Sequence, residues 1–339
     1  MWTFGYSHQT RSPWRSHAGA TYAECDRQGL LVWCEYPNVN DMGTTEAYRQ
    51  NALAGIREMI AQNRNRPSIV VWSVANEYRT NSVVRLDWLK RLVGDFAAEA
   101  RRLDPSRAVA AATCRSSLAD VNMLPDVTGF NFYPGWYRGE ADGMKATIDA
   151  ALAETPRQMI GVTEYGAGGN VDCHESAEVR NRTVCPFHSE EYQAWVHHGN
   201  YLTLKNDPRV WGTYVWLMFD FGADARREGS RYGLNDKGLV AFDHTTRKDA
   251  FHFYKANWNP EPMLHLVGQR MMSTTNAAGT VMSFWNGEGD VTLKVNGEAV
   301  GTVRPDDVKT AITVTAAFVV DIIRCPTRCS IGSGFQLAL

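Results

Sequence analysis

Two glutamates, each at the end of an apolar run, are the residues whose type and position best suit chemistry. Residues 68–76 precede Glu77, and residues 159–163 precede Glu164. Continuous runs of Val and Ile are typical of parallel strands covered on both faces, and a carboxylate where such a strand stops lies at the carboxyl edge of the sheet. Two convergent carboxylates can break a glycosidic bond; in the retaining reaction they stand about 5 to 5.5 Å apart, one as nucleophile and one as acid and then base. We therefore predict that Glu77 and Glu164 form a catalytic pair.

The neighbours of the two glutamates bear on this interpretation. A lone carboxylate at a strand end more often caps a helix or pairs with an arginine than takes part in catalysis. Here Asn76 precedes one glutamate and Tyr165 follows the other, and both side chains can position a substrate. The alternative from another class is a barrel that binds carbohydrate without turning it over. The intact Glu77 and Glu164 pair argues against that alternative.

The two strands belong to an alternation of β-type runs and helical patterns that continues to residue 258. The β-type runs are residues 30–35, 68–77, 109–113, 127–133, 159–164 and 210–219, and the helical patterns include residues 45–63, 83–103 and 189–205. This alternation predicts an α/β fold with a parallel sheet and right-handed crossovers. Six strands are two fewer than a closed barrel has, so we predict a (β/α)8 TIM-barrel truncated at its N-terminus. The open sheet edges favour a homo-oligomer.

A change of pattern after residue 258 predicts a second domain. Residues 257–262 read Asn-Trp-Asn-Pro-Glu-Pro and have the composition of a linker. Beyond them, short alternating runs are separated by Asn-Gly pairs, which are typical of β-hairpins. These runs are residues 280–285, 291–295 and 298–303. We expect residues 1–262 to form the barrel domain and residues 263–339 to form a partial antiparallel β-sandwich with an atypical tail.

Composition limits the classes of partner. With 44% hydrophobic and 21% charged residues the chain can fill a globular core, and a net charge of −2 offers no electrostatic footprint for nucleic acid or an anionic membrane. No stretch approaches the ~20 apolar residues of a membrane span. The first residues lack the pattern of an export signal, which favours a cytoplasmic location. No motif indicates a cofactor.

The seven cysteines are too few and too scattered for a disulfide scaffold. Cys173 and Cys185 lie in a polar stretch with His174 and His188, where a disulfide and two free thiols fit the sequence equally well. A zinc site is the least favoured interpretation, because the spacing matches no standard set of zinc ligands. We therefore predict no metal site.

Several motifs occur in order along the barrel part of the chain. They are RSH at 15–17, YAECDRQGLLVW at 22–33, NRPSIVVWSVANE at 65–77, FNFYPGWY at 130–137, TEYGA at 163–167 and YGLNDKGLV at 232–240. Together they resemble the catalytic barrel of glycoside hydrolase family 2, the family of β-galactosidases, β-glucuronidases and β-mannosidases. The resemblance implies a retaining glycosidase with Glu77 as the general acid/base and Glu164 as the nucleophile. The segment after Met263 resembles the β-sandwich that follows the barrel in many bacterial β-galactosidases.

The resemblance also implies which residues surround the sugar. Asn76 would hydrogen-bond the hydroxyl next to the anomeric carbon, a contact that strengthens in the transition state. The other residues that would line the site are Asn131, Tyr133, Trp136, Trp216 and Asp220. The first two barrel strands of the family have no clear counterpart here, and the altered spacing of the first motif leaves the role of His17 open.

Substrate choice depends on the motif at 232–240. Asn235 and Lys237 have the Asn-x-Lys spacing that resembles the carboxylate-reading motif of family 2 β-glucuronidases, and a lysine ammonium there could pair with a sugar acid. The wider context, with residues 248–251 and the linker at 257–262, looks more like bacterial β-galactosidases. We therefore expect an exo-β-galactosidase that also transglycosylates, with β-glucuronidase as the enzyme alternative.

Overall fold

The computed structural model describes most of the chain and divides it into two compact units. The described residues are 19–79, 83–155, 159–229, 231–271, 279–295, 297–315, 322–324, 328–330 and 336–338. The first unit comprises Met1–Phe132, Lys145–Tyr165 and Asp207–Leu217, and the second comprises Tyr133–Met144, Gly166–Asn206 and Met218–Leu339. His17 lies outside the described residues. The predicted division at residue 262 stays a prediction.

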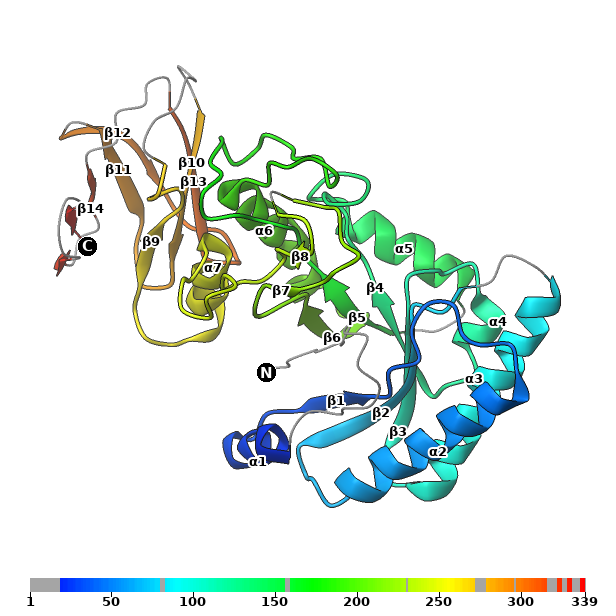
Figure 1. The fold of residues 1–339 in the computed structure, drawn as a ribbon. Helices are drawn as coiled ribbons and strands as arrows, with labels where there is room; N and C mark the ends of the chain where they lie inside the picture. The colour runs from blue at the N-terminus through cyan, green and yellow to red at the C-terminus, as the bar shows by residue number, and fades with distance from the viewer. Residues whose placement is uncertain are drawn as a thin grey trace. The chain divides into compact units, whose positions relative to one another are not determined.

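A six-stranded parallel sheet, in the order β1-β2-β3-β4-β5-β6, organises the first unit (Figure 1). Its strands are β1 (Val32–Glu35), β2 (Ile69–Asn76), β3 (Ala108–Thr113), β4 (Val127–Asn131), β5 (Ile160–Tyr165) and β6 (Val210–Val215). The helices along this part of the chain are α1 (Gly19–Gln28), α2 (Glu46–Asn63), α3 (Val83–Leu103), α4 (Ala119–Asn122) and α5 (Met144–Glu154). Because each strand pairs in parallel with the next in sequence, all six carboxyl ends lie at one edge of the sheet.

Helix α2 illustrates how the sequence determines these elements. Thr45 is its N-cap, and the Thr45 side chain accepts a hydrogen bond from the amide of Tyr48 at 3.2 Å. Such a cap contributes about 1 kcal/mol. Ile56, Met59 and Ile60 recur at helical spacing, and all three are buried in one core cluster with side chains of β2 and α3. Burying each of these side chains contributes about 1.5–3 kcal/mol.

The opposite face of the sheet is lined by aromatic rings from its two outermost strands. Trp33 of β1 stacks on Trp211 of β6 with ring centroids 6.0 Å apart, and it meets Tyr214 of β6 edge-on at 5.9 Å. Strands β1 and β6 are at opposite ends of the strand order, so the sheet must curve strongly for these rings to touch. The first unit is therefore a parallel half-barrel, which confirms the predicted α/β class and the partial TIM-barrel.

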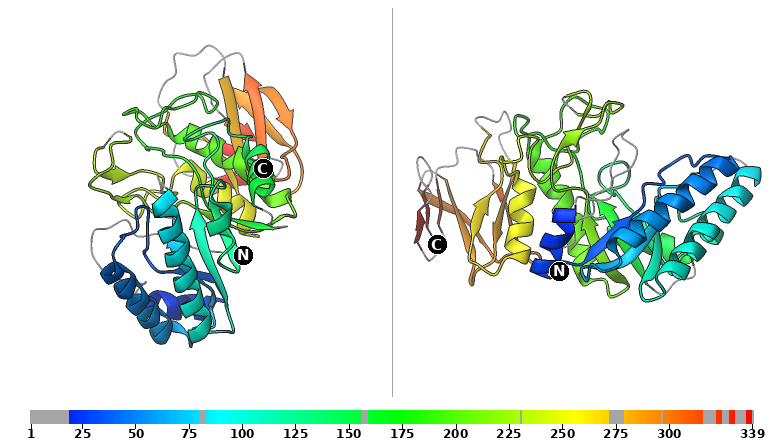
Figure 2. Two further views of the ribbon diagram at one scale, coloured as in Figure 1. Left: turned by 90° about the vertical axis from the view of Figure 1, so that its right-hand side faces the viewer. Right: turned by 60° about the horizontal axis from the view of Figure 1, so that its bottom comes forward.

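The described residues of the second unit form helices and several small sheets. Its elements are α6 (Glu190–Asn206), β7 (Phe221–Gly222), β8 (Leu234–Asn235), α7 (Asp249–Trp258), β9 (Leu264–Leu266), β10 (Gly279–Trp285), β11 (Val291–Val295), β12 (Glu298–Val303), β13 (Thr310–Thr315), β14 (Ile322–Arg324), β15 (Arg328–Ser330) and β16 (Gln336–Ala338). Strands β13-β10-β9 form one sheet and β12-β11-β14-β16-β15 another, mostly antiparallel as predicted. Figure 2 shows α7 lying against the first of these sheets.

The predicted elements agree with the observed ones except at a few places. The strand expected at residues 210–219 ends at Val215. Elements that were not predicted are the helices α1, α4, α5 and α7 and the strands β7, β8, β9, β13, β14, β15 and β16. Among the described residues, no helix has the length and apolar character needed to cross a membrane.

Candidate active site

Glu77 directly follows β2 and has an unusual backbone conformation. Its φ of 46° lies in the left-handed region, which residues other than glycine seldom adopt. The Glu77 amide donates to the carbonyl of Ala112 on β3 at 3.0 Å, and the carboxylate, 18% exposed, lies 3.7 Å from the guanidinium of Arg79. Outliers of this kind persist only where the surroundings hold them, and they cluster at functional sites.

Asn131, at the end of β4, connects the two predicted catalytic strands. Its Nδ2 donates to Oδ1 of Asn76 at 3.1 Å and to Oε1 of Glu77 at 3.2 Å. Its Oδ1 accepts a hydrogen bond from the hydroxyl of Thr163 on β5 at 2.9 Å. Asn76 and Asn131 are both buried. This network fixes the rotamer of Asn131 and holds the Glu77 carboxylate at the carboxyl edge of the sheet.

Glu164 reaches the same edge from β5. It pairs in register with Asn131 of β4, and its carbonyl accepts a hydrogen bond from the amide of Phe132 at 2.8 Å. The carbonyl of Tyr165, the next residue, accepts from the amide of Trp216 at 2.9 Å, and Trp216 is buried. Only β3 and β4 separate the strands that carry the two glutamates. The half-barrel thus brings Glu77 and Glu164 to one edge, as predicted.

A third carboxylate, Glu35 at the end of β1, was not predicted. Its Oε2 accepts hydrogen bonds from the hydroxyl of Ser73 at 2.8 Å and the indole of Trp33 at 3.2 Å. Burial raises the pKa of Glu35 to about 7, against the lowering effect of these two bonds, and the charge of Glu77 adds to the increase. A signal for Glu35 was present, because it ends the apolar run at residues 30–35.

In the second unit, Lys237 is enclosed by aromatic rings. Only 1% of its side chain is exposed, and its Nζ lies 5.3 Å from the ring centroid of Trp136 and 5.2 Å from that of Tyr137. Tyr133 meets Tyr137 edge-on at 5.2 Å. The ammonium also donates to Oε2 of Glu228 at 3.0 Å. Trp136, Tyr133 and Lys237 therefore belong to one cluster with Tyr137 and Glu228. Their role in binding a sugar stays a prediction.

Asn235 lies beside Lys237 with an unused hydrogen-bond donor. Its Oδ1 accepts from the amide of Lys237 at 3.2 Å, whereas its Nδ2 is buried and has no hydrogen-bond partner among the described residues. The indole nitrogen of Trp136 is also buried without a hydrogen-bond partner among the described residues. A buried donor without an acceptor costs about 1–3 kcal/mol. Two such donors near a buried ammonium suit a ligand that brings acceptor oxygens.

The remaining predicted site residue, Asp220, is held by protein groups. Its Oδ1 accepts hydrogen bonds from Nζ of Lys248 and from the amide of Gly238, both at 2.8 Å. Burial raises the pKa of Asp220 to about 6 although the charge of Lys248 opposes the increase. These bonds give the Asp220 side chain a structural role. The expected contact of Asp220 with a sugar hydroxyl stays a prediction.

The cysteines and the acidic groups bear on metal binding. Cys173 and Cys185 are free thiols, which decides between the two states that the sequence left open. His188 is hydrogen-bonded through Nδ1 to Oδ2 of Asp236 at 2.7 Å. In the part of the chain that the structure describes, no group of three or more His, Cys, Asp or Glu side chains is placed to hold a metal ion.

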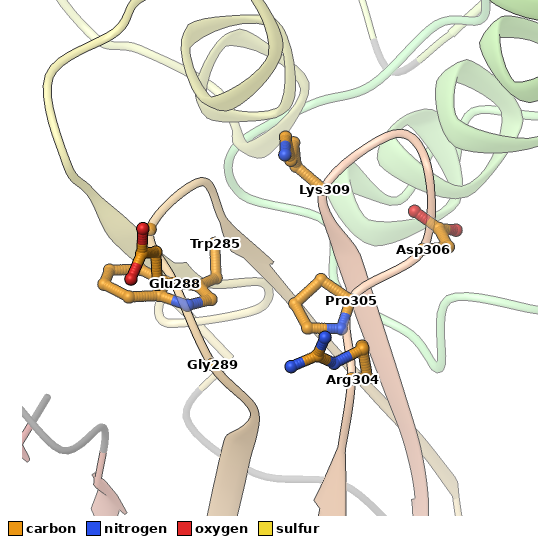
Figure 3. Close-up of a pocket in the computed structure, with 8 residues that line it drawn as sticks. Trp285, Glu288, Gly289, Arg304, Pro305, Asp306 and Lys309 are labelled. Atoms are coloured by element: carbon orange, nitrogen blue, oxygen red, sulfur yellow. The ribbon is translucent and has the colours of Figure 1, made fainter.

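A hollow of about 430 Å³ lies elsewhere in the second unit (Figure 3). It is lined by Trp285, Gly287, Glu288, Gly289, Arg304, Pro305, Asp306 and Lys309. Two of its charged groups are already engaged, since Asp306 is hydrogen-bonded to His198 at 2.6 Å and Arg304 donates to Asp290 at 2.9 Å. The hollow contains none of the predicted site residues.

Comparison with known families supplies the decisive observation. The model of the TIM-barrel domain of glycosyl hydrolases family 2 matches residues 17–261. The chain belongs to glycoside hydrolase family 2. The resemblance read from the sequence motifs is thereby confirmed.

Individual family 2 proteins bear on the substrate. A β-glucuronidase from Bacteroides fragilis is 34% identical over 86% of this chain and 42% of its own length. The crystal structure of an FMN-binding β-glucuronidase from Faecalibacterium prausnitzii is 32% identical and has a TM-score of 0.79, covering 90% of this chain and 46% of that one. The crystal structure of another B. fragilis protein, provisionally named a β-galactosidase, is 25% identical and has a TM-score of 0.77. It covers 96% of this chain and 49% of that one.

These comparisons favour the alternative substrate over the expected one. The two β-glucuronidases are more similar to the chain in sequence than the protein provisionally named a β-galactosidase, so the glucuronide alternative is better supported than the galactoside that the motif context favoured. The chain spans less than half the length of each of these relatives.

Proposed function

We propose that this family 2 chain acts as a retaining β-glucuronidase. The observation that carries the choice of substrate is the pair Asn235 and Lys237. A buried ammonium lies beside a buried amide donor to which the described residues offer no acceptor. A sugar carboxylate offers two acceptor oxygens and a negative charge, and charge-assisted hydrogen bonds are about twice as strong as neutral ones. A galactoside would offer only neutral hydroxyls to the same groups.

Glu77 and Glu164 divide the chemistry between them. Glu164 attacks the anomeric carbon while Glu77 donates its proton to the leaving oxygen, and Glu77 then activates the water that hydrolyses the glycosyl-enzyme. Asn131 would keep Glu77 aimed at the leaving group through the 3.2 Å contact with Oε1. Asn76 would hydrogen-bond the hydroxyl next to the anomeric carbon. The hydrogen bond that Asn131 donates to Oδ1 of Asn76 orients the Asn76 amide. Nδ2 of Asn76 would then be the donor to that hydroxyl.

The test compares nitrophenyl β-D-glucuronide with nitrophenyl β-D-galactoside. We expect faster turnover of the glucuronide, and Lys237→Ala should lower kcat/KM for the glucuronide alone, by roughly ten- to a hundredfold, through loss of one charged contact. Lys145→Ala is the matched control, because Lys145 is exposed and forms an ion pair with Asp149 in the other unit. Faster turnover of the galactoside by the wild type would refute the proposed substrate.

Glu164→Gln distinguishes an enzyme from a carbohydrate-binding barrel. It should remove turnover of both glycosides while leaving the thermal unfolding transition in place, because the amide cannot form the glycosyl-enzyme. A wild type that binds D-glucuronate in calorimetry but hydrolyses neither glycoside would instead support the non-catalytic alternative.

A further inference from the structure

The ammonium of Lys237 already forms an ion pair with Glu228. Nζ of Lys237 and a guanidinium nitrogen of Arg226 approach the same oxygen, Oε2 of Glu228, at 3.0 and 2.7 Å. The side chain of Lys237 is 1% exposed, whereas those of Glu228 and Arg226 are about one-fifth exposed. The lysine is therefore both neutralised and covered, and the groups that cover it face the outside.

The chain around Glu228 is built to hold this carboxylate. The amide of Arg226 donates to the carbonyl of Ala223 at 2.8 Å, and the amide of Gly233 donates to the carbonyl of Arg226 at 3.0 Å. Gly229 has a φ of 78°, and a Cβ there would lie 2.3 Å from Oδ2 of Asp236. Only glycine allows this approach, which brings Glu228 next to the residues 235–237.

The two cations share Glu228 as an ion-pair partner. Arg226 and Lys237 carry two positive charges against one negative charge on Glu228. The charge of Lys237 also acts on the buried carboxylate of Asp236, which is hydrogen-bonded to His188. Because Arg226 binds the same oxygen, Glu228 can leave Lys237 and keep a cationic partner. A neutral sugar supplies no charge to Lys237 in exchange for the broken ion pair, whereas a sugar acid does.

We propose that Glu228 is a built-in competitor for the substrate carboxylate and that it determines specificity by releasing Lys237 only to an anionic sugar. This inference rests on the proposed β-glucuronidase function. Glu228 does not take part in the chemical steps, so we expect it to change the affinity for the substrate and not kcat. A ligand that must first displace an internal group binds more weakly by the free energy of that displacement.

The experiment measures kcat and KM on nitrophenyl β-D-glucuronide together with the calorimetric Kd for D-glucuronate. Glu228→Gln keeps the size of the side chain and removes its charge; it should lower KM and Kd by about three- to tenfold and leave kcat unchanged. Glu140→Gln is the matched control, because Glu140 forms an exposed ion pair with Arg180 in the same unit. The control should match the wild type.

Arg226→Gln provides a test with the opposite sign. Without Arg226, Glu228 has only Lys237 as a cationic partner, so KM for the glucuronide should rise. If the substitutions merely loosen the chain around residues 226–228, Glu228→Gln and Arg226→Gln should shift KM in the same direction. That result would overturn the proposal. An unchanged or raised KM in Glu228→Gln would also overturn it.

The Lys237→Ala variant distinguishes a failure of the internal-competitor proposal from a failure of the β-glucuronidase proposal. If Lys237→Ala weakens D-glucuronate binding while Glu228→Gln does not strengthen it, the internal competitor is refuted and the β-glucuronidase proposal stands. If Lys237→Ala leaves D-glucuronate binding unchanged, both are refuted. Should Glu228→Gln fail to fold, Glu228→Asp shortens the reach toward Lys237 and is expected to lower KM in the same direction.

Discussion

At the scale of single residues, two carboxylates near one edge of the half-barrel have different surroundings. Glu77 contacts Asn131 and Arg79, whereas Glu35 receives its hydrogen bonds from Ser73 and Trp33. Burial raises the pKa of Glu35 to about 7, and the charge of Glu77 contributes to that increase. In the folded state Glu35 therefore keeps its proton to a higher pH than an exposed glutamate does.

We predict that Glu35→Gln makes the free energy of unfolding less dependent on pH between about pH 4.5 and pH 7. Burial raises the pKa of Glu35 to about 7 in the folded state, so over this range the unfolded chain releases a proton that the folded state keeps. The contribution of Glu35 to stability therefore falls by up to about 1.4 kcal/mol for each pH unit of increase. Urea unfolding of the wild type and the variant at several pH values measures the difference.

The control for this prediction is Glu58→Gln, which removes an exposed carboxylate from α2 of the same unit. Its pH dependence of stability should parallel that of the wild type. Parallel curves for the wild type and Glu35→Gln would mean that Glu35 does not carry this pH dependence.

Sequence patterns found the residues whose role follows from position along a strand and missed those whose role follows from a partner. Glu77 and Glu164 stand out because each ends an apolar run. The pair formed by Lys237 and Glu228 left no comparable signal, because nothing in the spacing shows that a turn folds Glu228 back onto the lysine. Glu35 also ends an apolar run, so its position could have been found. Its hydrogen bond from Ser73 of the neighbouring strand leaves no signal in the sequence.

At the scale of elements, two glycines paired in register on β5 and β6 have different surroundings. Gly161 of β5 pairs with Gly212 of β6. A Cβ at Gly161 would lie 2.4 Å from Cζ2 of Trp211, whereas the nearest atom to a Cβ at Gly212 is Cε2 of Tyr214 at 3.9 Å. Gly161 therefore makes space for the indole that stacks on Trp33, and Gly212 does not have that role.

We predict that Gly161→Ala destabilises the protein by about 1–3 kcal/mol, because the added methyl overpacks the inner face of the half-barrel. Gly212→Ala is the matched control; it should change the free energy of unfolding by less than about 1 kcal/mol, since the new methyl meets only an ordinary contact. Urea unfolding of both variants and the wild type measures the difference. Equal stabilities for the two variants would contradict the packing described for Trp211.

The elements that sequence reasoning found are those with strong local signals. Helix α2 has a cap at Thr45 and buried residues at helical spacing, and the parallel strands are continuous apolar runs. Helix α5 was missed although Met144, Ile148 and Ala151 are buried at helical spacing, because it has no acidic first turn and no basic last turn. The curvature that brings β1 and β6 together depends on tertiary contacts, which local patterns do not contain.

At the scale of the whole molecule, buried histidines link stability to pH. His197 of α6 has no exposed surface, and its Nδ1 is hydrogen-bonded to the hydroxyl of Tyr254 on α7 at 2.9 Å. Burial lowers the pKa of His197 to about 3, and the positive charge of Lys248 acts in the same direction. In the unfolded chain a histidine has a pKa of about 6.5. The folded state therefore keeps His197 neutral at pH values where the unfolded state takes up a proton.

The last prediction follows from this difference in proton uptake. As the pH falls from about 6.5 toward 3, only the unfolded state binds the proton, so the contribution of His197 to stability decreases by about 1.4 kcal/mol per pH unit. We expect His197→Gln to lose less stability than the wild type between pH 6.5 and pH 4.5, by about 2 to 3 kcal/mol. His244→Gln, which replaces an exposed histidine, is the control and should parallel the wild type. Urea unfolding at several pH values gives the slopes, and parallel curves for all three proteins would show that His197 does not carry this pH dependence.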